Sequence, residues 1–177
     1  MLAQRSARRG DFLLSSGRRS QLYVDARLTT MSPDGLLLIG SLGLLTIQRH
    51  FGEVDAVGGL TLGADPVAYA IAYASASTQR PIRAFTVRKD AKVHGTGRQI
   101  EGPFRQGDRV VVIEDVITTG GSALHALDVL HASGADIRGV LTVVDRGEGG
   151  REIIESRGVP VVALTLATEI LQLLPES

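Results

Sequence analysis

An uninterrupted apolar run that ends in two acids constrains the fold of this chain more than any other feature of its sequence. The run spans Val110 to Ile113, and Glu114 and Asp115 follow it directly. Strands that are apolar on both faces are typical of parallel sheets covered by helices on both sides. Four more strands are predicted, at 55–60, 81–87, 140–144 and 159–165, and helical stretches at 34–51, 64–75, 122–131 and 149–156 lie among them. This alternation predicts an α/β fold with a doubly wound parallel sheet.

Composition narrows the class of protein. The 177 residues, 44% of them hydrophobic, suit one domain, 1–177, with a buried core. The 19 basic and 19 acidic residues cancel, so we expect no chain-wide attraction to nucleic acid or membrane. The chain has no cysteine, which excludes a disulfide framework and a cysteine-ligated metal and fits a cytoplasmic protein. The longest apolar stretch, 35–47, is too short to span a bilayer, and no signal peptide is expected.

The residues after the apolar run have the chemistry of a ribose phosphate site. Ligands of such sheets bind beyond the carboxyl ends of the strands. A loop that leads into a helix offers free backbone N–H groups and a positive dipole end to a phosphate. Gly120 and Gly121 let the backbone approach the phosphate closely. The side chains of Thr118, Thr119 and Ser122 add hydroxyl donors. Glu114 and Asp115 suit sugar hydroxyls or a hydrated magnesium ion.

An ordinary acidic turn followed by a capped helix is the alternative interpretation of this segment. Two rival phosphate motifs fail. The chain contains no Gly-Lys dipeptide, which excludes a Walker A loop. No G-x-G-x-x-G lies between a predicted strand and helix, which argues against a dinucleotide-binding turn.

A basic loop is the second constellation. Residues 88–102 carry four fixed cations and a histidine among glycines. A solvated surface loop is one interpretation. The functional interpretation is a lid whose cations stabilise a leaving diphosphate and whose closure excludes water. The candidate catalytic residues of this lid are Arg88, Lys89, Lys92 and His94.

Residues 110–122 resemble the phosphoribosyl diphosphate signature of the type I phosphoribosyltransferases. The resemblance implies the type I fold with a small N-terminal hood, at about 1–30. It implies that the loop backbone holds the 5-phosphate and that the acids hold the ribose hydroxyls. The residues so implied in phosphoribosyl diphosphate binding are Glu114, Asp115, Val116, Ile117, Thr118, Thr119, Gly120, Gly121 and Ser122, together with the four lid residues.

The lid pattern R-K-x-x-K-x-H-G resembles the catalytic loop of the orotate phosphoribosyltransferase family. That resemblance implies a homodimer in which the loop of one subunit reaches the active site of the other. It also assigns Arg146 to the carboxylate of orotate and Thr118 to the base. Segments 12–25 and 58–66 resemble the hood and the diphosphate loop. Ser15 and Leu62 stand where members of the family carry lysine, so the diphosphate end depends more heavily on the lid.

The expected reaction joins orotate to phosphoribosyl diphosphate and releases orotidine monophosphate and diphosphate. No covalent nucleophile is needed, because alignment and stabilisation of the leaving group suffice. Mg2+ is expected on the substrate near Glu114 and Asp115, without a dedicated protein metal site. Lys92 and His94 both remain candidates for a proton donor. The alternatives are a purine-type phosphoribosyltransferase and a non-catalytic regulator that senses phosphoribosyl diphosphate.

Overall fold

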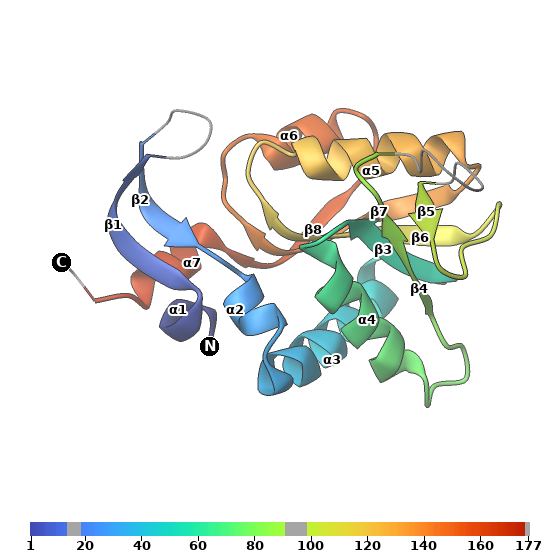
Figure 1. Cartoon of the computed structure of the whole chain (residues 1–177), viewed down its shortest axis with the longest axis horizontal. Coiled ribbons are helices and arrows are strands. Elements are labelled where there is room, and N and C mark those ends of the chain that lie inside the picture. The colour runs from blue at the N-terminus through green and yellow to red at the C-terminus, as the bar shows by residue number, and fades with distance from the viewer. Residues whose placement is uncertain (14–18, 91–98, 176–177) are drawn as a thin grey trace.

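A six-stranded sheet with helices on both faces forms the body of the molecule (Figure 1). The computed structural model describes residues 1–13, 19–90 and 99–175. The strand order is β5-β4-β3-β6-β7-β8, and all neighbouring pairs are parallel except β4 and β5. The strands are β3 (Ala56–Leu60), β4 (Arg83–Val87), β5 (Ile100–Glu101), β6 (Arg109–Ile117), β7 (Asp136–Asp145) and β8 (Val161–Leu166). The predicted α/β fold with a parallel sheet is confirmed.

The side chains of β6 alternate between two cores, as a strand buried on both faces requires. Val111 and Ile113 pack with α3 (Pro33–His50) and α4 (Ala64–Ser75), whereas Val110 and Val112 pack with α5 (Gly121–Ala132) and α6 (Gly150–Glu155). The apolar run therefore lies at the centre of the molecule, and the residues that follow it have a fixed position relative to both layers.

An N-terminal hairpin stands beside the sheet, at the end where both termini lie (Figure 1). It consists of β1 (Ala7–Leu13) and β2 (Arg19–Val24), flanked by the short helices α1 (Leu2–Arg5) and α2 (Arg27–Thr30). The C-terminal helix α7 (Ala167–Gln172) packs against α1, and Arg9 donates a hydrogen bond to the carbonyl of Leu171 at 2.8 Å. The hairpin corresponds to the expected hood.

The observed elements depart from the prediction in two places that matter for function. Strand β6 continues to Ile117, so Glu114 and Asp115 lie within it and not after it. The reason is that β7 is long and pairs with β6 as far as Ile117, opposite Asp145. In the charged loop, β5 adds a short antiparallel strand to the edge of the sheet. Its two residues are too few to show an alternating pattern in the sequence.

The chain reverses its direction across the sheet between β3 and β6. From β3 it passes through α4 to β4 on one side, and from β6 it passes through α5 to β7 on the other. Such a switch point leaves a crevice at the carboxyl ends of the two strands. Close packing holds them together there, since a Cβ atom built on Gly59 would lie 2.0 Å from the carbonyl oxygen of Ile113.

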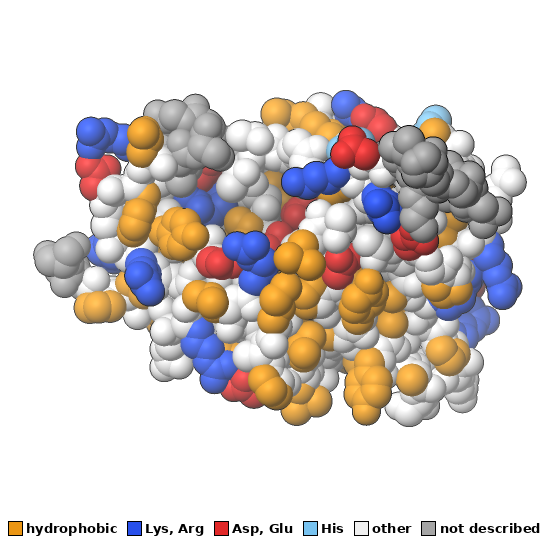
Figure 2. Space-filling view, viewed as in Figure 1, with side chains coloured by type: hydrophobic (Ala, Val, Ile, Leu, Met, Phe, Trp, Pro, Cys, Tyr) orange, Lys and Arg blue, Asp and Glu red, His pale blue; other side chains and the backbone are white. Residues whose placement is uncertain are grey.

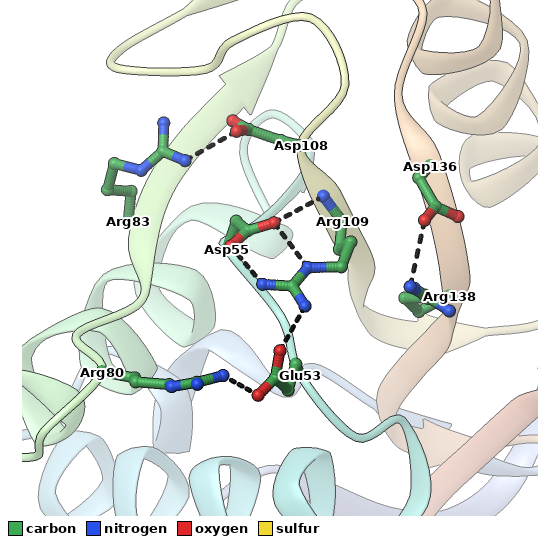
Figure 3. Close-up of polar contacts among 8 residues, drawn as sticks. All are labelled: Glu53, Asp55, Arg80, Arg83, Asp108, Arg109, Asp136 and Arg138. Carbon is green, nitrogen blue, oxygen red and sulfur yellow. Dashed lines mark hydrogen bonds and ion pairs between the residues drawn. The ribbon is translucent and has the colours of Figure 1, made fainter.

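Ion pairs join β3 and β6 at their amino ends, opposite the crevice (Figure 3). The Arg109 guanidinium donates from Nε and Nη2 to the Asp55 carboxylate at 2.8 and 2.7 Å. These hydrogen bonds lower the pKa of Asp55 to about 2. Arg83 pairs with Asp108 at 2.7 Å, and Glu53 contacts both Arg109 and Arg80. Strands β3, β4 and β6 are thus linked at the end away from the crevice.

We predict that Gly59→Ala destabilises the fold by about 3 kcal/mol, because the added methyl group has no room against the backbone of β6. Chemical denaturation measures the change. Gly121→Ala is the matched control, since no atom of the described residues lies within 4 Å of a Cβ built there. A Gly59→Ala protein as stable as the control would contradict the close packing of β3 on β6.

Candidate active site

A cavity of about 410 Å³ lies at the carboxyl ends of β3 and β6, below the end of the hairpin. Figure 2 shows acidic and basic side chains close together across the middle of this face. The described residues that line the cavity are Tyr23, Val24, Asp25, Ala26, Arg27, Leu60, Thr61, Leu62, Gly63, Lys89, Glu114, Asp115, Val116, Thr118, Ser122 and Arg146. The structure therefore brings together candidates from the acidic pair, the phosphate loop, the lid and the carboxyl end of β7.

The two acids differ in their surroundings. Glu114 is only 6% exposed, and burial, followed by the charge of Asp115, raises its pKa well above the ordinary value. Asp115 packs on the backbone of the loop after β3, since a Cβ built on Gly63 would lie 2.3 Å from its Oδ1. The backbone N–H of Val116 donates to the same oxygen at 3.0 Å. Asp115 is thus held where the two strands meet.

The start of α5 has the backbone geometry that suits an anion. Its N-cap residue is Gly120, in the left-handed region with a φ of 81°, and no side chain caps the helix. The carbonyl of Thr118 accepts a hydrogen bond from the N–H of Gly150 at 2.9 Å, which ties the loop to α6. Among the residues that the structure describes, no side chain caps the first-turn N–H groups of α5, and the loop that presents them is held in place.

The predicted residues of this loop do not all face the cavity. Val116, Thr118 and Ser122 line it. In contrast, the side chain of Ile117 is 1% exposed and packs in the core on the α5 side of the sheet. Ile117 can contribute only through its backbone.

The loop between β3 and α4 is held by a buried carboxylate. Asp65, 9% exposed, accepts hydrogen bonds from the hydroxyls of Thr61 at 2.7 Å and Thr86 at 2.8 Å. The peptide between Thr61 and Leu62 is cis. Leu62 is 56% exposed at the cavity wall, so the described part of this loop presents no cation to the cavity.

Arg146 separates this cavity from a second hollow of about 350 Å³ beside the hairpin, and it lines both. Its Nη2 donates to the Ser20 hydroxyl and the Leu22 carbonyl, both at 2.9 Å, and lies 3.0 Å from a carboxylate oxygen of Glu148. The guanidinium is therefore oriented by β2 and by the loop after β7, and the side chain is only 6% exposed.

The lid is described only at its ends. Lys89 lines the cavity. Arg88 is exposed and lies 3.6 Å from Glu101, while its backbone N–H donates to the carbonyl of Gln99 at 2.8 Å. Both ends of the loop therefore start from one place beside the cavity. The other two lid candidates, Lys92 and His94, lie outside the described residues, as does Ser15 in the hairpin.

Sequence reasoning missed Asp25 and Arg27, which also line the cavity. Arg27 donates from Nε and Nη2 to Asp25 at 2.8 and 3.1 Å, and this pairing lowers the pKa of Asp25 and raises that of Arg27. An acid and an arginine two residues apart within the predicted hood were visible in the sequence. Nothing in the sequence placed them over β3 and β6.

Metal binding or membrane insertion by residues 1–13, 19–90 and 99–175, the described part of the chain, would each indicate another function. No group of three or more histidine, aspartate or glutamate side chains there could hold a metal ion. No helix in the described ranges is long and apolar enough to cross a membrane.

Known proteins match the chain over nearly its whole length, although no protein-family model matches it. It is 50% identical over 160 residues to the orotate phosphoribosyltransferase of Aquifex aeolicus, covering 90% of this chain and 86% of that protein. The crystal structure of the Mycobacterium tuberculosis orotate phosphoribosyltransferase in complex with phosphoribosyl diphosphate is similar with a TM-score of 0.79 and 40% identity, covering 96% and 93% of the two chains.

The orotate phosphoribosyltransferase of Aeropyrum pernix gives a TM-score of 0.81 at 36% identity, covering 97% of each chain. Sequence and fold are thus shared along almost the entire length of relatives from distant organisms. The chain belongs to the orotate phosphoribosyltransferase family.

Proposed function

We propose that this chain transfers the 5-phosphoribosyl group from phosphoribosyl diphosphate to orotate, giving orotidine 5'-monophosphate and diphosphate in pyrimidine biosynthesis. One observation carries the proposal. A single cavity is lined by the phosphate loop, the paired acids, a lid cation and Arg146. These are the groups that the two substrates require, and they come from segments far apart in the chain.

In this proposal the 5-phosphate lies against the first-turn N–H groups of α5, with the hydroxyls of Thr118 and Ser122 nearby. Glu114 and Asp115 accept hydrogen bonds from the ribose hydroxyls. With the phosphate and the diol both held, the anomeric carbon has one orientation, and the base attacks as the bond to diphosphate stretches. Much of the rate then comes from alignment.

Arg146 and Thr118 are the proposed orotate contacts. A planar guanidinium recognises a carboxylate bidentately. The Nη2 of Arg146 is engaged by the hairpin and Glu148, which fixes the guanidinium at the cavity wall. A cation held at this wall favours a carboxylated base over the neutral bases that a purine-type enzyme uses.

The oxygen-rich lining fits a magnesium ion carried by the substrate. Glu114 and Asp115 offer hard oxygen atoms, and Asp115 contacts the loop between β3 and α4. Such an ion neutralises charge on the leaving diphosphate when it is bound. Its charge would also favour the ionised form of Glu114 when substrate is present.

The lid residues Arg88, Lys89, Lys92 and His94 are proposed to contact the diphosphate and to close the site of the partner subunit in a homodimer. Apolar side chains on α3 support a second copy of the chain as partner, since Leu37 and Leu45 are 73% and 62% exposed. We place the enzyme in the cytoplasm, in keeping with a chain without cysteine.

The function is tested by following orotate absorbance with phosphoribosyl diphosphate and magnesium. We expect orotate to be consumed and an Arg146→Gln variant to raise the KM for orotate by about tenfold or more. The KM for phosphoribosyl diphosphate should change little. Turnover of adenine or hypoxanthine without consumption of orotate would refute the proposal.

Glu114→Gln should raise stability at neutral pH and lower activity. Because the folded pKa of Glu114 is raised, its stabilising contribution is present below the unfolded value of 4.5 and is lost as pH rises through the folded pKa. Thermal unfolding should show the variant more stable than the native chain at pH 8 and similar to it at pH 4. The exposed Glu155→Gln is the control. Lower stability of Glu114→Gln at pH 8 would contradict the buried carboxyl.

Mixing two inactive variants tests the shared site. Lys92→Ala removes a lid cation, and Glu114→Gln removes a ribose contact. If the lid acts on the partner, mixed dimers hold one site with both parts intact, and the mixture should regain orotate consumption that neither variant has alone. Mixed dimers, verified by two affinity tags, that stay inactive would show that each lid serves its own subunit.

A further inference from the structure

One of the charged side chains that line the cavity, Arg27, belongs neither to the lid nor to the proposed orotate contact. The described lining of the cavity contains three acids, Asp25, Glu114 and Asp115, and three cations. Of the cations, Lys89 belongs to the end of the lid, and Arg146 is engaged with β2 and Glu148. The third, Arg27, lies outside both the lid and the proposed orotate contact. Positive charge close to a diphosphate stabilises it, and a cation outside the lid can do so independently of the lid residues.

Arg27 has a fixed position at the cavity wall. The preceding residue, Ala26, is 1% exposed, and Asp25 donates its backbone N–H to the carbonyl of Ser6 at 2.8 Å. Two residues further, Thr29 is 2% exposed and its hydroxyl bonds to that of Ser6 at 2.7 Å. The backbone on both sides of Arg27 is therefore anchored between α1 and the hairpin.

The guanidinium of Arg27 is aimed by Asp25 and keeps donors free. Asp25 engages Nε and Nη2, while Nη1 has no hydrogen bond among the residues that the structure describes. The side chain of Arg27 is 48% exposed, whereas that of Asp25 is 21% exposed. The negative charge of Asp115 acts on Arg27 as well, and both residues line the same cavity as Leu62.

We propose that Arg27 is a binding residue for the diphosphate of phosphoribosyl diphosphate, supplied by the hood in place of a cation on the loop between β3 and α4. This inference rests on the proposed function. Leu62 gives that loop an apolar side chain at the cavity wall. Arg27 provides the charge from the opposite element, with Asp25 orienting it. The 5-phosphate end, held by α5, does not involve Arg27.

Binding measurements separate the two ends of the substrate. We expect Arg27→Gln to weaken binding of inorganic diphosphate, with magnesium, by about tenfold in isothermal titration calorimetry, as loss of a charged hydrogen bond predicts. Binding of ribose 5-phosphate should be unchanged. Arg5→Gln is the matched control, since Arg5 forms a similar ion pair with Asp34, at 2.6 Å, and does not line the cavity.

A second variant asks whether charge at this wall is what matters. Leu62→Lys in the Arg27→Gln background should restore diphosphate affinity from the facing loop. Unchanged diphosphate binding by Arg27→Gln, equal loss of ribose 5-phosphate, or no recovery with Leu62→Lys would each overturn the assignment. The orotate assay of the native chain is independent of these titrations. A native chain that binds diphosphate but consumes no orotate would refute the proposed function and not the role of Arg27.

Discussion

The close approach of β3 to β6 is the constraint on which the site depends. Gly59 lets the backbone of β3 reach the carbonyl of Ile113, and Gly63 lets the next loop lie against the carboxylate of Asp115. Because the chain leaves these two strands in opposite directions, a crevice opens above a tightly packed pair. A side chain at either glycine would push β3 or the loop after it away from β6 and Asp115. The same contact therefore stabilises the sheet and sets the distance between the two halves of the site.

The cavity combines charges that are costly to hold without substrate. Glu114 is buried beside Asp115, and its raised pKa reflects that cost. In the proposed function, a substrate that carries a diol and a divalent cation relieves this cost, and part of its binding energy comes from charges that are poorly satisfied in the free chain. In contrast to Glu114, Arg146 has partners in the free chain, because the hairpin and Glu148 contact its Nη2 without any ligand. In the proposed function, the contact to orotate is thus held in place before the ligand binds, and the ribose contacts gain most from a charged ligand.

Much of the architecture was predictable because buried strands and helices have characteristic patterns of apolar residues in the sequence. The helix at 64–75 matches α4 residue for residue, and the apolar runs matched to β3, β6 and β7 lie at the heart of the sheet. Elements that bury few side chains were not predicted from the pattern: β5 and α7 were missed, and the hairpin was expected only as a hood implied by the resemblance. Strand β5 has two residues, and the hairpin and α7 bury little of their surface in the main core. The length of β6 was underestimated, because acids are rare in buried strands and pairing with β7 overrides that tendency.

By itself the sequence determined the phosphate loop, the acidic pair and the α/β layering, because each is local: a glycine-rich turn, two adjacent carboxylates and apolar periodicity need no partner to be recognised. Only the tertiary structure decided which distant residues share the cavity. It placed Arg27 over the acids, turned the side chain of Ile117 into the core and made Arg146 a bridge to the hairpin. The physical reason is that such contacts depend on strand order and on the packing of the hood, which pair residues more than a hundred positions apart, as in the bond from Arg146 to Leu22.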